Sequence, residues 1–445
     1  MAEVMLAAVT ETMVTLLTVD PHPWAGAMST KSLILSVNAG SSSVKVSVYT
    51  LSSEPHQIAE AQLDGLTAPP AKLSYTRGST TVAKGKEQQQ DVKDQGAAFS
   101  ILLDELVNDS NLTQLARKED ITHVCHRVVH GGDYSKQQAI TKETLQTLEE
   151  LSSLAPLHNA PALSIVRSCL DKLPGTRNIA CFDTQFHRSL PEHVRTYPIN
   201  QEVARKNGLR KYGFHGLSYS FITRAVADFL GKKPEETSLI ALHLGSGASA
   251  CAIKGGKSWD TSMGLTPLAG LPGATRSGSV DPSLVFHYAS DVGKLSPAST
   301  KDLHVSQAED ILNKQSGWKA LTGTTDFGAI SKGYDSDPAK KLAFDLFVDR
   351  ICGFVGSYYV SLHGEVDALV FAGGIGEKSA ELRKRVVEQC ACLGFAIGEE
   401  ANGKGGGDDV VRDISGKGKH KVLICKTDEQ LEMAREVVEI ESLSA

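Results

Sequence analysis

Two arginines occupy segments that are typical of anion recognition. Arg127 lies in an alternating apolar run, residues 126–130, that ends in two glycines. An arginine in an apolar strand is seldom buried without a partner. Arg127 therefore predicts either a guanidinium fork for a carboxylate or phosphate, or an internal salt bridge. Arg276 lies in a long loop of low charge, residues 266–282, and loops of this kind often line binding sites.

Acids and histidines with the right surroundings for chemistry come next. Asp183 ends a short apolar run, residues 179–182, and ligands bind at the carboxyl ends of strands in α/β sheets; the alternative is a helix N-cap. His215 lies between glycines where a helix begins, and the alternative is a capping or core histidine. Weaker candidates are a second histidine, His158, and two acids suited to metal-linked roles, Glu377 and Glu429.

Two glycine-serine turns, half a chain apart, must position these side chains. Residues 33–49 and 239–256 each read as a β-hairpin whose tip carries little side-chain bulk. Such tips can press backbone N–H groups against phosphate oxygens. The segment Asn38–Ser41 corresponds to His243–Ser246 when the hairpins are superposed. The repetition predicts a duplicated domain with a phosphate compound between the copies.

Two segments resemble common nucleotide-binding motifs, but each lacks a part that the motif requires. A P-loop ending at Lys257 and Ser258 would need a glycine at position 251, where Cys251 stands. Residues 245–250 fit the loose dinucleotide pattern, which requires a following helix. The residues that follow are short and rich in glycine, so we expect a returning strand. A nicotinamide-dependent oxidoreductase is therefore the less favoured alternative.

Composition limits the class of protein. The 445 residues suit two domains, and the net charge of −6 argues against a nucleic-acid partner. The eight cysteines lack zinc spacing and predict core thiols in a reducing compartment. The sequence contains no run of 18 apolar residues, so we expect no membrane-spanning helix. The first thirty residues resemble neither a transit peptide nor a secretory signal, so we expect a disordered extension and a cytoplasmic protein.

Hydrophobic periodicity predicts an α/β architecture in both halves. Residues 74–94 are expected to form an exposed strand and loop, and residues 398–421 a surface loop. A buried strand is expected at 366–371. Helices are expected at residues 96–106, 142–154, 161–173, 218–229, 339–362, 380–392 and 429–439.

These segments resemble the acetate kinase family, in its fungal form, from about residue 33 to the C-terminus. Eight motifs carry the resemblance in order: VNAGSSSVK, HRVVHGG, LAPLHNAPAL, FDTQFH, KYGFHG, HLGSG, TPLAGLPGATRSGSVDP and GGIGEKS. The family implies two RNase H-like (actin-like ATPase) domains with the active site in the cleft between them. It also implies reversible phosphoryl transfer between ATP and acetate, with Mg²⁺ (or Mn²⁺), by a homodimer. The implied divisions are residues 1–31 as an extension, 32–183 joined by a helix at 430–445, and 184–429 as the nucleotide-binding and dimerisation domain.

The resemblance assigns roles position by position. The catalytic positions are Asp183, His215, Arg276, Arg127 and His158. Arg127 also binds the substrate, and the pocket for the acetate methyl group is formed by Val129, Leu157, Phe214 and Pro267. Magnesium is held by Asn38 and Glu429, in part through water. The phosphates and nucleotide are bound by Ser41, Ser43, Lys45, His243, Leu244, Gly245, Ser246, Gly247, Asp326, Phe327, Gly328, Gly374, Ile375, Gly376, Glu377 and Lys378.

The chemistry explains these residue types. Phosphoryl transfer spreads negative charge over the equatorial oxygens, so catalysis depends on positioning and electrostatic stabilisation. We expect Arg127, Arg276, His215 and Mg²⁺ to supply the positive charge. Acetate is already ionised and needs no general base, so Asp183 is expected to orient an arginine or the metal's ligands.

Three positions depart from the family pattern. Bacterial and archaeal members usually have asparagine, arginine and asparagine where this chain has Ser246, Gly328 and Lys378. All three lie in nucleotide segments, so another nucleotide or pyrophosphate is the alternative to ATP as donor. A propionate or butyrate kinase is the alternative for the acceptor. A non-catalytic nucleotide switch would not need Arg127, His215 and Arg276 together.

Overall fold

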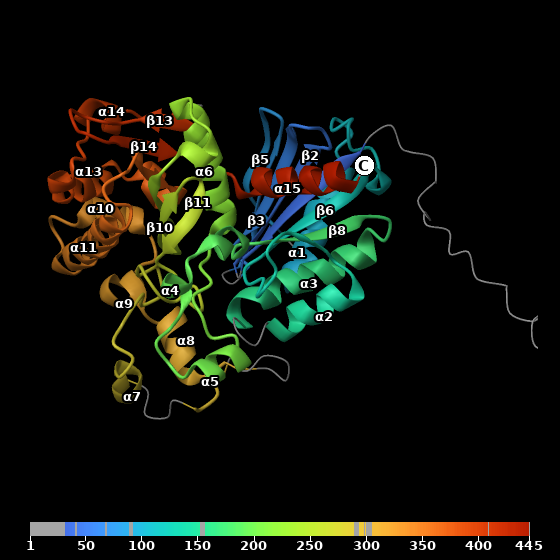
Figure 1. Cartoon of the computed structure of the whole chain (residues 1–445). Helices are drawn as coiled ribbons and strands as arrows, with labels where there is room; N and C mark the ends of the chain where they lie inside the picture. Colours follow the sequence, from blue (N-terminus) through green and yellow to red (C-terminus); the bar gives the residue numbers. More distant parts are fainter. Residues whose placement is uncertain are drawn as a thin grey trace, which may run out of the picture.

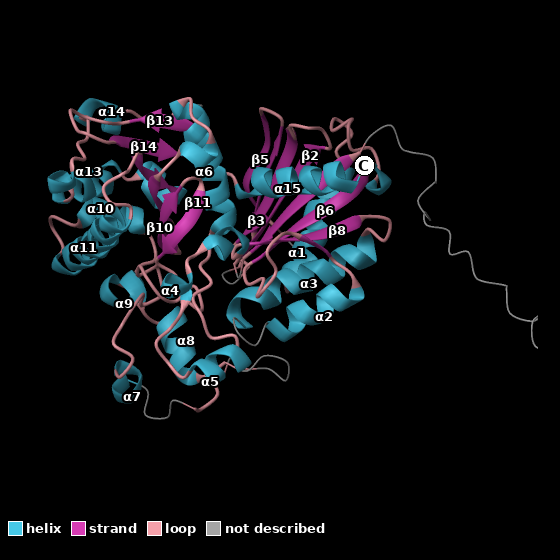
Figure 2. Ribbon diagram, viewed as in Figure 1, coloured by secondary structure: helices cyan, strands magenta, loops and turns pink. Residues whose placement is uncertain are grey.

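The computed structural model describes residues 32–40, 42–66, 69–88, 92–151, 156–288, 293–297, 299, 305–407 and 409–444, with the backbone alone at 156–158 and 443–444. Within these residues the strands form one eight-stranded and one six-stranded sheet, each flanked by helices (Figures 1 and 2). The extension expected at residues 1–31 lies outside the described residues.

The first sheet has the strand order β5-β4-β3-β2-β1-β6-β8-β7. Its strands are β1 Leu33–Ala39, β2 Ser43–Thr50, β3 Gln57–Asp64, β4 Lys72–Arg77, β5 Thr80–Glu87, β6 Ile121–Val128, β7 Gln138–Ala139 and β8 Arg177–Phe182. The second sheet has the order β11-β10-β9-β12-β14-β13. Its strands are β9 Leu239–Leu244, β10 Ala248–Lys254, β11 Lys257–Thr261, β12 Ala368–Ala372, β13 Val411–Asp413 and β14 Lys421–Cys425.

The two sheets share a five-strand core of the same topology. In the first, β3, β2 and β1 are antiparallel neighbours, and β1 continues into parallel β6 and β8. In the second, β11, β10 and β9 are antiparallel, and β9 continues into parallel β12 and β14. The duplication predicted from the two hairpins is therefore confirmed. Since β10 is a strand, the helix that a dinucleotide fold requires after residue 245 is absent from this described segment.

The helices lie on both faces of each sheet. They are α1 Gln95–Val107, α2 Lys142–Leu151, α3 Pro156–Lys172, α4 Glu192–Arg195, α5 Gln201–Lys206, α6 Gly216–Leu230, α7 Leu284–Tyr288, α8 Gln307–Lys314, α9 Gly317–Thr322, α10 Phe327–Gly333, α11 Pro338–Ser361, α12 Gly373–Lys378, α13 Ala380–Gln389, α14 Glu399–Gly403 and α15 Glu429–Ser444. Short 3₁₀ turns are η1 Lys118–Asp120, η2 Gln185–Ser189, η3 Pro234–Glu236 and η4 Ala391–Leu393. All seven predicted helices are present, within a few residues of their expected ends; residues 152–154 lie outside the described residues.

Alternation along the central strands builds a core on each face. Leu35 of β1 packs in the cluster that contains α1 and α3, whereas Ile34 packs with α15. In β9, Leu242 packs with α11 and Ala241 with α6. Helix α15 comes from the C-terminus, yet it lies across the first sheet and beside α6 (Figure 1). It thereby links the two halves.

One predicted segment is wrong. Residues 398–421 were expected to be a surface loop, but they contain α14 and β13, and β14 begins at Lys421. Their glycine, lysine and aspartate content favours a loop. Pairing of β13 with β14 overrides that preference because the pairing buries Val411. Ile414, which follows β13, is also buried. The strand expected at 74–94 is present as β4 and β5, and most of β5 is exposed.

Two further observations concern membrane spans and the domain limits. The described helices are each too short or too polar to cross a bilayer. Strands β1–β8 lie between residues 33 and 182, and β9–β14 between 239 and 425. The domain limits themselves remain predictions.

Candidate functional site

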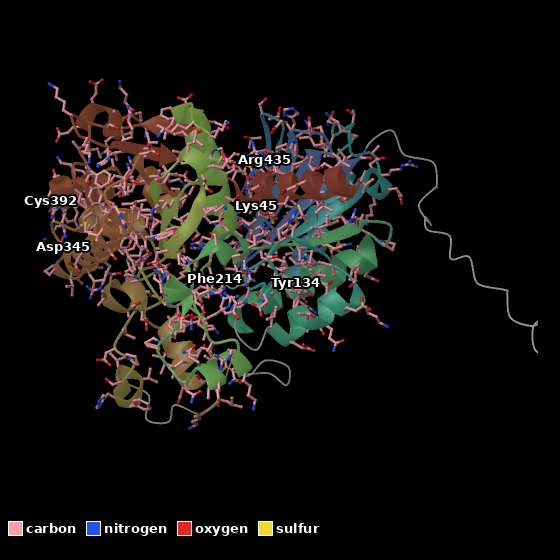
Figure 3. The ribbon with its side chains drawn as sticks, viewed as in Figure 1. Lys45, Tyr134, Phe214, Asp345, Cys392 and Arg435 are labelled. Carbon is pink, nitrogen blue, oxygen red and sulfur yellow. The ribbon has the colours of Figure 1, made fainter. Side chains whose placement is uncertain are left out.

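The carboxyl ends of the parallel strands from both sheets face one cleft of about 1150 Å³. Asn38 lies near the end of β1 and Arg127 near the end of β6, and both line it. The other half contributes His243 of β9 and Gly373, which follows β12. Lys45 and Phe214, labelled in Figure 3, lie near the junction of the two halves. The duplicated topology therefore brings two equivalent strand ends together.

Arg127 and Asp183 form a bidentate ion pair at the bottom of the cleft. Arg127 Nε lies 3.0 Å from Asp183 Oδ1, and Arg127 Nη2 lies 2.7 Å from Oδ2. Arg127 Nη1 also lies 3.2 Å from Glu429 Oε2. Asn38 completes the group, because its Nδ2 donates to the same Glu429 oxygen at 3.2 Å. The salt-bridge alternative for Arg127 is thus realised within the cleft, and Asp183 is not an N-cap.

The charges of Arg127, Asp183 and Glu429 compensate one another because these side chains are in direct contact. Burial alone would lower the pKa of Arg127, but the Asp183 and Glu429 carboxylates raise it above its usual range. Burial would raise the pKa of Glu429, and Arg127 and His243 outweigh that effect and lower it. Burial raises the pKa of Asp183, while Arg127 opposes the rise. Because both Asp183 oxygens accept N–H groups from Arg127, the geometry selects the ionised form.

Arg276 differs from Arg127 because it has no acidic partner in the described part of the chain. Its Nη1 donates to the backbone oxygen of Pro267 at 3.0 Å. Burial and the neighbouring Arg127 lower its pKa to about 10. A Cβ atom on Gly247 would lie 2.2 Å from Arg276 Nη2, so only glycine lets the guanidinium lie against the second hairpin. Arg276 is therefore a cation held ready for an anion in the cleft.

His215 stands at the start of α6 in a left-handed conformation, with φ at 59°. Its Nδ1 lies 2.8 Å from Ser249 Oγ, and its ring stacks on His243 with centroids 4.2 Å apart. Burial, His243 and Arg127 hold the pKa of His215 well below its usual range. A lowered pKa favours the neutral imidazole in the substrate-free protein, and a neutral ring can still donate a hydrogen bond. That His215 supplies positive charge during transfer remains a prediction.

The turn before α6 is pressed against Asp183. The Gly216 N–H donates to the Asp183 backbone oxygen at 2.9 Å, and a Cβ on Gly216 would lie 2.1 Å from that oxygen. His187 supports the turn from η2, because its Nε2 lies 2.9 Å from the Phe214 backbone oxygen. This packing fixes His215 relative to the Arg127–Asp183 pair.

An apolar cluster stands at one wall of the cleft. Phe214 is buried and packs with Tyr212 and Met263, and Val129 packs against this cluster from the cleft side. Pro267 presents its backbone oxygen to Arg276. Of the predicted methyl-pocket residues, Val129 lines the cleft, Phe214 is buried behind it, and Pro267 contacts Arg276 without lining the cleft. The side chains of Leu157 and His158 lie outside the described residues, as does Ser41.

The predicted nucleotide residues divide into two groups. Those that line the cleft are Lys45, His243, Gly245, Ser246, Gly247, Gly374 and Glu377. The others do not line it: Ser43, Leu244, Asp326, Phe327, Gly328, Ile375, Gly376 and Lys378. Leu244 and Phe327 are core residues, and Asp326 caps α10 by accepting from the Gly328 N–H at 2.8 Å. Lys45 also pairs with Glu60 at 2.9 Å.

Sequence reasoning missed several residues of the site. Ser249 holds His215, and Ser218 holds His243 through Nδ1 at 2.8 Å. Ser249 lies among small apolar residues on the second strand of the second hairpin, so its burial could have been predicted. Its partner in α6 could not. Lys314 of α8 and Lys426 after β14 line the cleft without any motif that marks them.

Asn38 and Glu429 are the described residues best suited to hold a metal ion. Their side chains meet, and their oxygen atoms are hard donors that suit Mg²⁺. No group of three or more histidine, cysteine or acidic side chains in the described residues could hold an ion unaided. A Mg²⁺ ion commonly keeps several waters and substrate phosphate oxygens, so this small donor set fits.

The arrangement suits an anionic group that is recognised from two sides. Arg127 is rigid because its partners hold it, and Arg276 is electrostatically unsatisfied. His215 offers a further hydrogen bond. Val129 presents an apolar side chain to the cleft. Together these side chains suit a small carboxylate next to a phosphoryl group.

The chain was compared with known families and structures. The sequence profile of the Acetokinase family matches residues 33–435. A probable acetate kinase from Chaetomium globosum is 60% identical over 446 residues, covering 91% of this chain and 97% of that protein. The crystal structure of Porphyromonas gingivalis acetate kinase matches with a TM-score of 0.78 and 31% identity, covering 92% of this chain and 100% of that one. A propionate kinase structure from Francisella tularensis matches with a TM-score of 0.78 and 34% identity, covering 91% and 98%.

Proposed function

The chain belongs to the acetokinase family, and we propose that it is an acetate kinase, which transfers a phosphoryl group reversibly between ATP and acetate. The observation that carries the proposal is the contrast between the two cleft arginines. Arg127 is held by Asp183, whereas Arg276 lacks a carboxylate partner in the described residues. A transferring phosphoryl group between them supplies the missing negative charge.

The acceptor carboxylate attacks the γ-phosphorus in line with the leaving ADP oxygen. Acetate binds with its methyl group against Val129, which Phe214 supports from behind, and this directs a carboxylate oxygen toward the phosphorus. No proton has to be removed because acetate is ionised at neutral pH. The arginines stabilise the charge on the equatorial oxygens, and His215 donates a hydrogen bond to one of them. This positioning accounts for the chemistry without a covalent enzyme intermediate.

Asp183 is a positioning residue in this mechanism. Its two oxygens hold the Arg127 guanidinium in one plane. Its backbone oxygen also anchors the turn that carries His215. A bidentate pair of this kind fixes orientation as well as charge.

Magnesium is proposed as the metal, with Asn38 and Glu429 as the residues that hold it, in part through water. Bound there, the ion would neutralise phosphate charge. Glu429 is suited to this role because the pKa of its carboxyl is lowered by Arg127 and His243 despite burial. Manganese, which also accepts oxygen donors, is the alternative.

ATP is the proposed donor, bound along Gly245–Gly247 and Gly374. The altered positions Ser246, Gly328 and Lys378 keep GTP and pyrophosphate as alternatives. The acceptor preference is also a proposal, since one methylene group is worth only about 1–3 kcal/mol in a hydrophobic pocket.

We also propose a homodimer in a reducing, cytoplasmic compartment. Apolar side chains are exposed on the part of the second half that carries α5 and α7, including Val203, Leu284 and Phe286, of which Phe286 is 73% exposed. Burying such side chains favours self-association. Size-exclusion chromatography with light scattering tests the dimer, and Phe286→Glu is expected to weaken it. All eight cysteines are free thiols, which suits a reducing compartment.

Acyl phosphate formation, trapped as the hydroxamate, tests the function. The purified chain is incubated with Mg²⁺, one acid (acetate, propionate or butyrate) and one donor (ATP, GTP or pyrophosphate). We expect the highest kcat/KM with ATP and acetate and measurable activity with propionate. Product with another donor only would reassign the cosubstrate, and no product with any pair would contradict the proposal.

A further inference from the structure

A second cavity, of about 370 Å³, lies beside the cleft. It is formed where the end of α12, the start of α13, α14, β13 and the end of β14 meet. Three residues line both spaces: Glu377, Val410 and Lys426. The cavity is therefore separate from the arginine pair but continuous with the cleft wall.

Positive charge dominates the described lining of this cavity. Its described cationic residues are Lys378, Arg383, Lys404, Arg412 and Lys426, and its described carboxylates are Glu377 and Asp409. Burial raises the pKa of the Glu377 carboxyl, which weakens its opposing charge. Four glycines, at positions 403 and 405–407, add backbone that a ligand can approach closely.

The cations here bond mainly to backbone oxygens rather than to acids. Arg412 Nη1 donates to the backbone oxygens of Ala401 and Lys404, at 2.9 and 2.6 Å. Lys426 Nζ donates to the Gly407 oxygen. Lys404 is the exception, because it pairs with Glu400 at 2.9 Å on an exposed surface. The guanidinium of Arg412 thus keeps donors that no described residue accepts.

Arg383 is the strongest sign of a missing anion. Its side chain is 2% exposed, and no described carboxylate pairs with it. It donates to Asn402 Oδ1 at 2.7 Å and to the backbone oxygens of Gly376 and Glu377 at 2.8 Å. Burial and Arg412 lower its pKa to about 10. Its hydrogen bonds are largely satisfied, but its charge is not, and an anion in the cavity would compensate it.

We propose that this cavity binds a small phosphate-bearing anion, at a site distinct from that of the transferring phosphoryl group. Arg412, Lys378 and Lys404 contact the anion, and buried Arg383 contributes its field. Because Lys426 and Glu377 also line the cleft, a bound anion changes nucleotide affinity. This last effect rests on the proposed function, whereas anion binding itself does not.

Calorimetric titration of pyrophosphate into the full chain tests the site. The titration is made with saturating ATP and without magnesium or acetate, so that the nucleotide and its γ-phosphoryl group fill the cleft, the space between the two arginines included. We expect one equivalent to bind to the wild-type chain. Arg412→Gln and Lys404→Gln are each expected to weaken binding about tenfold or more, because each removes a charged donor. The matched control is Lys384→Gln, which removes the same charge from α13 but lies outside the cavity and pairs with Glu399.

Three results would overturn the proposal. They are no binding once ATP is present, an equal loss in Lys384→Gln, and unchanged binding in Lys404→Gln. The first would place the anion in the nucleotide cleft, and the second would indicate a general charge effect. Should Arg412→Gln fail to fold, Lys404→Gln decides alone. Acyl phosphate formation by the same preparation reports on the proposed function separately, because an active kinase without the second site would overturn only the anion proposal.

Discussion

Arg127 and Asp183 are joined through both oxygens of the carboxylate, with contacts of 3.0 and 2.7 Å, at a point where Asp183 is 1% exposed. The aspartate therefore holds the arginine in one plane. It has no free oxygen on that pair with which to remove a proton from a substrate. This relationship makes Asp183 a residue that orients a cation.

Asp183→Asn is expected to lower kcat by about 10²-fold, because a small misplacement of Arg127 disturbs the reacting geometry. Added Mg²⁺ is expected to restore part of the loss by supplying charge. Steady-state kinetics over a magnesium series check this. A variant that shows no rescue, and whose pH–rate profile lacks one ionisation of the wild type, would return Asp183 to a general-base role.

Removing the carboxylate that pairs with Arg127 and removing Arg276 itself are expected to have opposite effects on stability. Asp183→Ala leaves Arg127 buried with one partner fewer, and breaking a buried pair costs about 3–5 kcal/mol. Arg276→Ala removes a buried cation that has no described acidic partner, so the free energy of unfolding should stay unchanged or rise, while kcat falls about 10³-fold. Urea unfolding of both variants is the measurement. A large loss of stability in Arg276→Ala would show that this arginine is structurally compensated.

Gly247→Ala is expected to displace the Arg276 guanidinium, since the new methyl group would lie 2.2 Å from Nη2. The expected loss is about 10²-fold in kcat. Gly245→Ala is the matched control for kcat at saturating ATP, because its Cβ would meet no protein atom closer than 3.4 Å. Equal losses in the two variants would mean that the hairpin backbone, rather than Arg276, is responsible.

Acid is expected to destabilise the protein through its buried histidines. Burial lowers the pKa of His187 to about 4, although the Phe214 oxygen opposes this. Between pH 6.5 and 4 the unfolded chain takes up a proton that the folded chain refuses. Stability is therefore retained above pH 6.5 and lost as the pH falls, by up to about 3 kcal/mol for this group.

Urea unfolding at pH 7.5, 6 and 5 checks the histidine prediction against His187→Gln, which cannot titrate. The variant is expected to have a shallower pH dependence than the wild type. His126 and His130 have pKa values lowered by burial to about 4 and remain in both proteins, so the difference isolates one group. Identical slopes would rule out a depressed pKa at His187.

Val129→Ala is expected to widen the apolar end of the cleft. The KM for propionate or butyrate should fall relative to that for acetate, because the longer chain gains room and apolar contact. The ratio of kcat/KM values for the acids is the measurement. An unchanged ratio would remove Val129 from the acyl pocket.

Much of the architecture follows from local pattern. Two short hairpins predicted the duplication because the same turn chemistry imposes the same antiparallel start on each sheet. Apolar residues at helical spacing predicted helices such as α6 and α11, because that spacing places them on one buried face. Composition was misleading at residues 398–421, where the content of glycine, lysine and aspartate predicted a loop but β13 forms an edge strand by pairing with β14.

The site was predicted less evenly. Arg127, Asp183 and Arg276 stand in recognisable contexts, and the structure places Arg127 and Asp183 in contact. The pairing of Ser249 with His215 could not be predicted because it joins α6 to β10, and no local pattern encodes that distance. The lowered pKa of His215 arises from burial and from the neighbouring histidines and arginines that the fold gathers. Asp326 lies in a predicted nucleotide segment, yet the structure uses its side chain as a helix cap.

The central claim is direct transfer from ATP to acetate within the cleft formed by both sheets. A single-turnover experiment with enzyme in excess over γ-labelled ATP and Mg²⁺, quenched with and without acetate, tests it. We expect label in acetyl phosphate only when acetate is present, and no label on the protein at any time. A labelled protein that forms before the product and passes its phosphoryl group to acetate, or the absence of acetate-dependent label, would contradict the account.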